Sequence, residues 1–257
     1  MLKILHQLYS HHASSLFAGI LLFVVAAPVT EATNPPPDPA LVLYYSFDKN
    51  AGETARDRSI YGNDGKIIKA KYLTEHGGRQ GVLRFDGEQS VLCFPDSDSL
   101  SFGGDMSFEM VVRLNAPSKP GMLFGDRSNF GFYVGYWNVL NLAYTNFDSE
   151  LSANESINTP VTRRIIGDRW SHIAVVIAHP RIRFYHNGEL VRDAYIPIPF
   201  QKRHKKATSR IGGFKDRHAP IDLDEFRLYR RALTATEIAA HARGEQIDLN
   251  PVHTNWQ

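Results

Sequence analysis

The sequence contains one cysteine, Cys93, among its 257 residues. A single cysteine excludes an intrachain disulfide, so a large hydrophobic core or a bound metal has to stabilise the fold. In the apolar run SVLCF we expect Cys93 to be a small buried side chain.

The formal net charge is only +2. Such a small charge creates no global field directed at nucleic acid, so nucleic acid is not an expected partner and any charged binding surface is local.

The short motifs that define many enzyme classes are also missing. The chain has no Gly-x-Ser-x-Gly, His-Glu-x-x-His or Cys-x-x-Cys motif and no phosphate-binding P-loop. The acidic, glycine-rich stretch DRSIYGNDG (57–65) lacks the spacing of a helix–loop–helix calcium site. It is more typical of a surface turn, which can still offer an oxygen ligand to a metal. None of these patterns predicts catalysis.

Long apolar runs are limited to the N-terminal region. LFAGILLFVVAA (16–27) follows Lys3 and is shorter than the roughly 20 residues that a membrane-spanning helix needs. Small residues come next, which predicts a signal peptide over residues 1–32, with an uncleaved membrane anchor as the alternative. The proline-rich residues 33–40 predict an extended linker. We therefore expect a secreted, periplasmic or cell-envelope protein.

From residue 41 onward the apolar runs are short and strand-like. In MSFEMVVRL (106–114) the apolar residues alternate with Ser107, Glu109 and Arg113, which predicts a strand with one buried face. WSHIAVVIA (170–178) is apolar on both faces, which predicts a central strand with Trp170 in the core.

Two turns are expected between strands. Asn187-Gly188 favours the positive φ angles of a two-residue hairpin turn. Residues 87–89 are expected to form another short hairpin connection.

One helix is expected, near the C-terminus. Thr234 and Glu237 form a capping box, and Gly244 is placed to end the helix. Residues 246–257 then form a tail. Many strands, one terminal helix and no βαβ alternation predict an all-β fold over residues 41–245, a two-sheet antiparallel sandwich or jelly roll.

The order of several motifs points to a family. YYSFD (44–48), DRSIYGNDG, GGRQGVLRFDG (77–87), RIGG (210–213) and LDEFRLYRRALTATEI (223–238) follow one another along the chain. The series resembles the laminin-G-like domain of the concanavalin-A-like lectin/glucanase superfamily over about residues 41–244. The resemblance implies a jelly roll that is usually non-catalytic, is often linked to carbohydrate or protein binding, and in many members holds a structural calcium. APIDLDEF departs from the family pattern through an extra Asp222 and the lack of a glycine.

The acids of IDLDEF are more typical of a metal site or an ion pair than of a catalytic site. Regular strand alternation places Asp222 and Asp224 on one face and Glu225 on the other, without the paired glutamates of a laminarinase-type glycosidase. Because Asp224 would share its face with core residues, it needs a partner. That partner is either an arginine or a calcium ion, which prefers oxygen ligands. The resemblance implies that the loop ends SFD and FDG lie beside the last strand, so Asp48 and the Gly87 carbonyl are the expected further calcium ligands. Glu225 is expected to form a solvated ion pair with Arg227.

A basic loop and an aromatic pair are the candidate ligand contacts. QKRHKK (201–206) includes Lys202, Arg203, Lys205 and Lys206, which would attract an acidic glycan if the run is more than a solvated loop. Tyr136 and Trp137 could stack on sugar rings. The expected function is an exported carbohydrate-binding module. The alternatives are a protein-interaction or adhesion module that binds an extracellular protein and, less favoured, a glycoside hydrolase.

Overall fold

The computed structural model describes residues 38–101, 103–115, 121–126, 130–134, 140–145, 154–158, 169–196, 209–214 and 216–245. The predicted signal peptide, most of the predicted linker and the predicted C-terminal tail lie outside these ranges, as do Tyr136, Trp137, Lys202, Arg203, Lys205 and Lys206.

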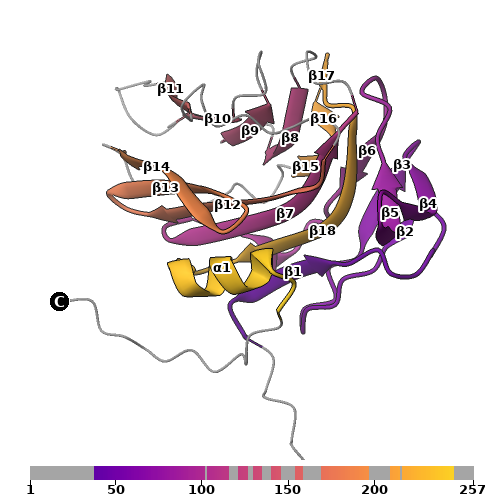
Figure 1. The fold of residues 1–257 in the computed structure, drawn as a ribbon, viewed down its shortest axis with the longest axis horizontal. Helices are drawn as coiled ribbons and strands as arrows, with labels where there is room; N and C mark the ends of the chain where they lie inside the picture. The colour runs from indigo at the N-terminus through magenta and orange to yellow at the C-terminus, as the bar shows by residue number, and fades with distance from the viewer. Residues whose placement is uncertain are drawn as a thin grey trace, which may run out of the picture. The chain divides into compact units, whose positions relative to one another are not determined.

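The strands form two sheets, and the predicted two-layer sandwich is confirmed (Figure 1). Sheet A has the order β14-β13-β12-β7-β18-β5-β4, with β1 also paired to β18. Its strands are β1 (Leu41–Tyr45), β4 (Lys71–His76), β5 (Arg79–Arg84), β7 (Met106–Leu114), β12 (Ser171–Ala178), β13 (Arg181–His186), β14 (Glu189–Tyr195) and β18 (Ile221–Tyr229).

Sheet B has the order β11-β10-β9-β8-β15-β6-β3-β2, with β16 and β17 attached beside β8. Its strands are β2 (Thr54–Ala55), β3 (Gly65–Ile68), β6 (Val91–Cys93), β8 (Gly121–Asp126), β9 (Phe130–Val134), β10 (Leu140–Thr145), β11 (Asn154–Asn158), β15 (Arg210–Ile211), β16 (Gly213–Phe214) and β17 (Arg217–His218). A single turn of 3-10 helix, η1, spans Asp98–Leu100. Apart from one parallel pair between β17 and β8, the ladders are antiparallel.

The main core fills the space between the sheets. It contains aromatic rings from both layers, and the Phe124 ring centroid lies 5.1 Å from that of Phe108 and 4.9 Å from that of Phe226. The predicted alternation of apolar residues in β7 is confirmed, because Phe108, Met110 and their alternate neighbours all belong to this core. The prediction of a single buried face is wrong, since Ser107 and Glu109 on the other face are also buried. Edge-to-face aromatic contacts of this kind add to the burial of apolar area.

Helix α1 (Ala235–Ala242) packs on the outer face of sheet A, the face turned away from sheet B (Figure 1). The predicted capping box of Thr234 and Glu237 is present. Ile238 and Leu233 lie in a second apolar cluster with Ala174 and Tyr229 of sheet A. Gly244 follows the helix with φ of 75°, as predicted for the terminating residue. No helix of the described residues is long and apolar enough to cross a membrane.

Two local predictions have opposite outcomes. Asn187 and Gly188 have positive φ angles and join β13 to β14, so this hairpin is confirmed. The segment 87–89 does not form a hairpin, because β5 belongs to sheet A and β6 to sheet B. The chain crosses between the layers here, and a hydrophobic pattern alone cannot distinguish this crossing from a turn within one sheet. Cys93 is half-buried in β6.

Candidate functional site

The site begins where two strands share one edge of β18. The second half of β18 pairs with β1, and its first half pairs with β5. The chain leaves β1 at Tyr45 and passes β5 so closely that a Cβ atom on Gly81 would lie 2.3 Å from the Phe47 carbonyl oxygen. Gly81 also has φ of +66°, so both its conformation and its surroundings require glycine.

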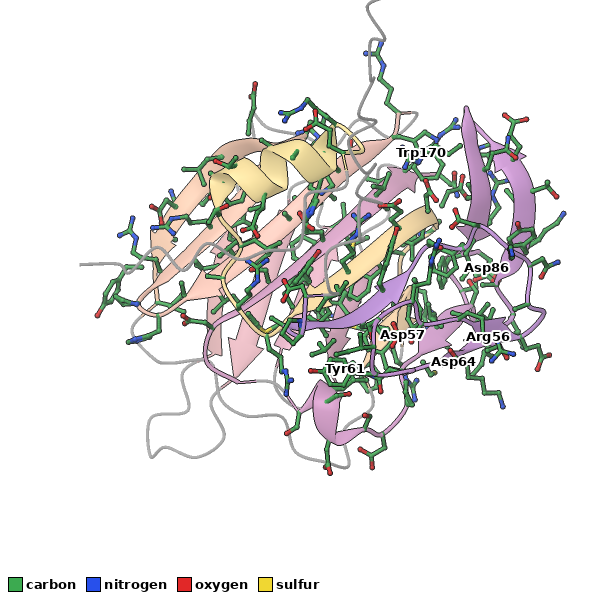
Figure 2. The ribbon with its side chains drawn as sticks, turned by 90° about the horizontal axis from the view of Figure 1, so that it is seen from below. Arg56, Asp57, Tyr61, Asp64, Asp86 and Trp170 are labelled. Atoms are coloured by element: carbon green, nitrogen blue, oxygen red, sulfur yellow. The ribbon has the colours of Figure 1, made fainter. Side chains whose placement is uncertain are left out.

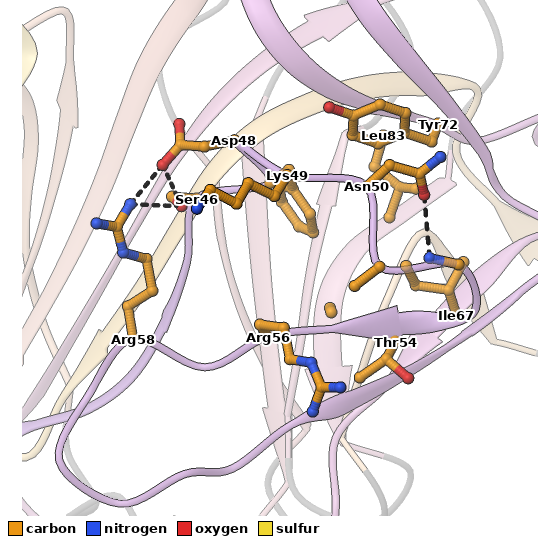
Figure 3. Close-up of a pocket in the computed structure, with 14 residues that line it drawn as sticks. Ser46, Asp48, Lys49, Asn50, Thr54, Arg56, Arg58, Ile67, Tyr72 and Leu83 are labelled. Atoms are coloured by element: carbon orange, nitrogen blue, oxygen red, sulfur yellow. Dashed lines mark hydrogen bonds and ion pairs between the residues drawn. The ribbon is translucent and has the colours of Figure 1, made fainter.

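Beyond this contact the loop between β1 and β2 covers a cavity, which we call the loop pocket (Figure 3). Its volume is about 340 Å³, within the size range of small-ligand sites. The lining residues are Ser46, Phe47, Asp48, Lys49, Asn50, Ala51, Gly52, Thr54, Ala55, Arg56, Arg58, Ile67, Tyr72 and Leu83.

The floor of the loop pocket is apolar. Phe47, Ile67 and Leu83 all belong to the main core and are at most 8% exposed. Tyr72 of β4 is half-buried beside them. The pocket therefore lies at the edge of the sandwich, where the main core reaches the surface.

The rim of the loop pocket is polar. Arg58 forms an ion pair with Asp48, and the Ser46 hydroxyl donates a 2.7 Å hydrogen bond to the same carboxylate (Figure 3). Arg58 also donates to the Ser46 oxygen at 3.0 Å. The Asn50 side chain accepts a hydrogen bond from the Gly52 N–H at 3.0 Å and so supports the loop. An apolar floor under a rim of hydrogen-bonding groups suits a ligand with both C–H and hydroxyl surfaces.

The stretch 57–65, predicted as a surface turn, braces this loop (Figure 2). The Asp57 carboxylate accepts hydrogen bonds from the N–H groups of Tyr44, Ser59 and Asn63 at 2.7 to 2.9 Å. Asp64 accepts from the Asp57 N–H and forms an ion pair with Arg56. Asp57 and Asp64 therefore hold the backbone of this stretch in place by hydrogen bonds, and the turn prediction is confirmed.

A second hollow lies beside the loop pocket. It has a volume of about 460 Å³ and is lined by Glu53, Thr54, Arg56, Asp64, Gly65 and Lys66. Thr54 and Arg56 line both cavities. The two cavities therefore adjoin at these residues.

The acids of β18 are not arranged as strand alternation predicts. The register to β7 shifts between Leu223 and Glu225, which places a β-bulge at Asp224. Core residues lie at odd positions before the bulge, such as Leu223, and at even positions after it, such as Phe226. The predicted face of Asp224, shared with Phe226 and Leu228, is therefore wrong. Glu225 and Asp222 are paired with Val111 and Arg113 of β7, and both turn away from the main core.

Asp224 pairs with Arg79 at the start of β5. Burial raises the pKa of Asp224 to about 6 despite this partner, and the charges of Glu225 and Asp48 push it in the same direction. The Asp48 charge thus acts on Asp224, although each of the two carboxylates pairs with a different arginine. Of the two alternatives left open by the sequence, the arginine is the partner seen in the structure.

The described donors around Asp224 do not fit a calcium site well. The carboxylates of Asp48 and Asp224 each already face a guanidinium group. Gly87 follows the end of β5 and packs against Pro220, whereas Asp224 pairs with Arg79 at the start of β5. Nearby, Asp86 accepts N–H bonds from Glu88, Gln89 and Ser90 within its own loop. Among the described residues no group of three or more His, Cys, Asp or Glu could hold a metal ion.

Asp222, which departs from the family pattern, has a structural role. Its side chain is fully buried and accepts two hydrogen bonds from Arg84, at 2.7 and 2.8 Å, and one from Asn115 at 2.9 Å. Burial would raise the pKa of Asp222, but these bonds and the charges of Arg84 and His76 lower it. Asp222 therefore ties β18 to β5 and to the end of β7.

The predicted pair of Glu225 and Arg227 is present, with a distance of 2.7 Å between Oε2 and Nη2. It is less solvated than expected, because the two side chains are only 24% and 14% exposed. The Arg227 guanidinium lies 4.5 Å from the centre of the Tyr44 ring, and Arg58 of the pocket rim lies over the same ring. This ladder of arginine and tyrosine joins the pocket rim to the outer face of sheet A.

Trp170 does not lie in the core, contrary to expectation. It is half-buried, belongs to neither apolar cluster, and donates to the carbonyls of His76 and Gly77 at the β4–β5 turn. Figure 2 shows it well apart from Arg56 and Asp64. It precedes the first residue of β12, so the two-sided burial of that strand does not extend to it.

Of the predicted site residues, the structure thus brings Asp48 to the loop pocket and to Asp224. It adds Lys49, Asn50, Arg58 and Tyr72, which the sequence did not single out. The only signal for the first two was their position in the polar, glycine-containing loop DKNAG.

Sequence comparison places residues 86–239 in the concanavalin A-like lectin/glucanases superfamily. A comparison with curated proteins finds no match. The structure is also similar to many solved structures. For the three described next the sequence identity is low, so the likeness concerns the fold.

Two of the similar structures are binding domains of botulinum neurotoxins. One is the serotype D ligand-binding domain in complex with N-acetylneuraminic acid (TM-score 0.64, 12% identity, 81% of this chain and 52% of that chain). The other is the binding domain of neurotoxin DC in complex with rat synaptotagmin II (TM-score 0.64, 12% identity, 82% and 53%). The chain spans about half the length of these domains.

A third similar structure is matched over nearly its full length. It is domain 4 of an extracellular arabinanase from Geobacillus stearothermophilus, in complex with arabinotriose (TM-score 0.62, 19% identity, 79% of this chain and 98% of that chain).

Proposed function

The chain belongs to the concanavalin A-like lectin/glucanases superfamily, and on this premise we propose that it is a non-catalytic module that binds carbohydrate in the loop pocket. The observation that carries the proposal is the pocket itself, an apolar floor of Phe47, Ile67 and Leu83 under a polar rim of Asp48, Asn50 and Arg58. A sugar ring has an apolar C–H face and a hydroxylated edge, and both find matching surfaces here.

The similar structures support this class of ligand. The arabinanase domain is in complex with arabinotriose, and the serotype D domain is in complex with N-acetylneuraminic acid. A module of the same fold that binds an oligosaccharide is therefore in keeping with its relatives. The second hollow beside Thr54 and Arg56 gives room for further sugar units.

The charges in the pocket argue against hydrolysis. A retaining glycosidase places two carboxyl groups about 5 Å apart, one on each side of the scissile bond. The lining of the loop pocket contains one acid, Asp48, and Arg58 already pairs with it. Incubation with β-glucans and analysis of the products tests this directly, and we expect no cleavage.

We also propose that the protein acts outside the cytoplasm, as the predicted signal peptide implies, where polysaccharides are accessible. Cell fractionation tests this location. The basic run 201–206 lies outside the described residues, so its role in binding acidic glycans stays a prediction, which retention on a heparin column tests.

A glycan array on the full chain, followed by calorimetry on the best ligand, tests the proposed function. Asn50→Ala and Tyr72→Ala alter the rim and the wall of the pocket and are expected to weaken binding at least several-fold. Tyr195→Ala is the matched control, because this tyrosine is 62% exposed on β14, the opposite edge strand of sheet A from β4. Binding to synaptotagmin-like or other proteins but to no glycan would instead favour a protein-interaction module.

A further inference from the structure

We propose that the loop pocket selects a sugar that carries an anionic group, a carboxylate or a sulfate, and that Lys49 recognises this group. The inference rests on the proposed function, since it names the class of ligand that the same pocket takes. It is derived from the charges that line the pocket and from the partners that each charged group has.

The pocket lining has four charged side chains, of which three are positive: Lys49, Arg56 and Arg58, with Asp48 as the single acid. Arg58 and Asp48 pair with each other, and the Ser46 hydroxyl donates a further hydrogen bond to Asp48. Arg56 pairs with Asp64, which lines the second hollow. These pairs account for every lining charge except Lys49.

Acids in the surroundings do not neutralise Lys49. On the outer face of sheet A, Asp224 pairs with Arg79 and Glu225 pairs with Arg227. No ion pair joins Lys49 to any residue that the structure describes. A positive charge without a partner at the mouth of a cavity attracts an anionic ligand.

The position of Lys49 suits a substituent on a sugar ring. It lies in the covering loop between Asp48 and Asn50 and lines the loop pocket (Figure 3). Its ammonium group is a compact charge on a flexible stem, so it can reach either a carboxylate or a sulfate.

The second hollow has equal numbers of positive and negative side chains, unlike the loop pocket. Its charged residues are Glu53, Arg56, Asp64 and Lys66, so two positive charges face two negative ones. We therefore assign the anionic unit to the loop pocket and a neutral neighbouring unit to the second hollow.

Calorimetry on the full chain with matched trisaccharides tests the proposal. The probes are a galactose trimer, the corresponding galacturonate trimer and a sulfated galactose trimer, each at low and at physiological salt. Because Lys49 is exposed, one such contact gives an expected preference of about 2- to 5-fold for an acidic trimer. The preference should shrink as salt screens the charge. The acidic trimer that binds more tightly relative to the neutral trimer identifies the recognised group as a carboxylate or a sulfate.

Lys49→Met should abolish the preference for the acidic trimer and leave the affinity for the neutral trimer unchanged. Arg192→Met is the matched control, since it removes one exposed positive charge from β14, at the opposite sheet edge, and should retain the preference. Equal affinity of the wild-type protein for neutral and acidic trimers would overturn the inference and leave the proposed function standing. Loss of preference in both variants would also overturn it, because it would show a general charge effect. Failure of these trimers and of every glycan on the array to bind would overturn the proposed function itself.

Discussion

Arg79 and Asp224 form an ion pair because a β-bulge in β18 turns this part of the strand out of its regular alternation. The bulge lies where β5 stops pairing with β18 and β1 begins. At the same point the chain leaves β1 to form the loop over the pocket. The bulge at Asp224 therefore accounts both for the arrangement of Asp222, Asp224 and Glu225 on sheet A and for the position of the candidate site.

The first prediction concerns the pH dependence of stability through Asp224. Burial raises the pKa of this group to about 6, above the value of about 3.9 for an unfolded chain. The folded protein therefore binds more protons between these values, and stability should increase as the pH falls from about 6 to 4. Chemical unfolding of the wild type and of Asp224→Asn at each pH measures the effect. The difference in unfolding free energy should change by about 2 kcal/mol, and a constant difference would contradict the account.

A second prediction concerns acid unfolding through Glu109 of β7. Burial alone would raise the pKa of Glu109, but two histidines lower it to about 2. His241 of α1 is hydrogen-bonded to Glu109 at 2.7 Å, and Nε2 of His172 in β12 lies 3.3 Å from its Oε1. Arg227 of β18 pairs with Glu109 across the strands and also faces this cluster. A lowered pKa stabilises the fold above about pH 4.3, and this contribution is lost as the pH falls toward 2.

Glu109→Gln should therefore be less stable than the wild type at pH 6, by about 3 kcal/mol. The two proteins should converge in stability as the pH approaches 2. Convergence already at pH 6 would mean that the carboxylate does not hold α1 on the sheet.

A third prediction uses two glycines with nearly the same backbone conformation. Gly81 has φ of +66° and no room for a Cβ, whereas Gly62 has φ of +62° and nothing within 4 Å. Gly62→Ala should cost about 1 kcal/mol from conformation alone. Gly81→Ala should cost more, because Phe47 must move, and it should also weaken glycan binding. Equal losses in melting temperature and unchanged binding in both variants would show that this contact does not shape the pocket.

The fourth prediction concerns calcium. Because Arg58 and Arg79 already face Asp48 and Asp224, we expect the melting midpoint to be the same with calcium and with a chelator. This outcome would remove the calcium hypothesis. A midpoint that rises with calcium in the wild type and not in Asp224→Asn would show instead that the cation displaces Arg79.

Regular patterns in the sequence predicted the regular parts of the fold. Alternation in β7, the Asn187-Gly188 turn and the Thr234 capping box depend on local chemistry, and all are present. The bulge at Asp224 was missed because counting alternate positions assumes an uninterrupted strand. Only the pairing of β18 with strands distant in the sequence shows where the positions that face the core change from odd to even.

The loop pocket was missed for a related reason. Its lining comes from the β1–β2 loop, β3, β4 and β5, and tertiary structure alone brings these segments together. Asp48 was recognised because the family resemblance marked it. Lys49 and Tyr72 carry no signal that distinguishes them from other surface residues.

The most direct measurement is two-dimensional NMR of the labelled full chain titrated with the tightest-binding glycan from the array. We expect shift changes centred on residues 46–58 and on Ile67, Tyr72 and Leu83, with little change in α1 and β14. Changes confined to α1, β14 or other segments, with the loop pocket unperturbed, would contradict the assignment of the pocket as the carbohydrate site.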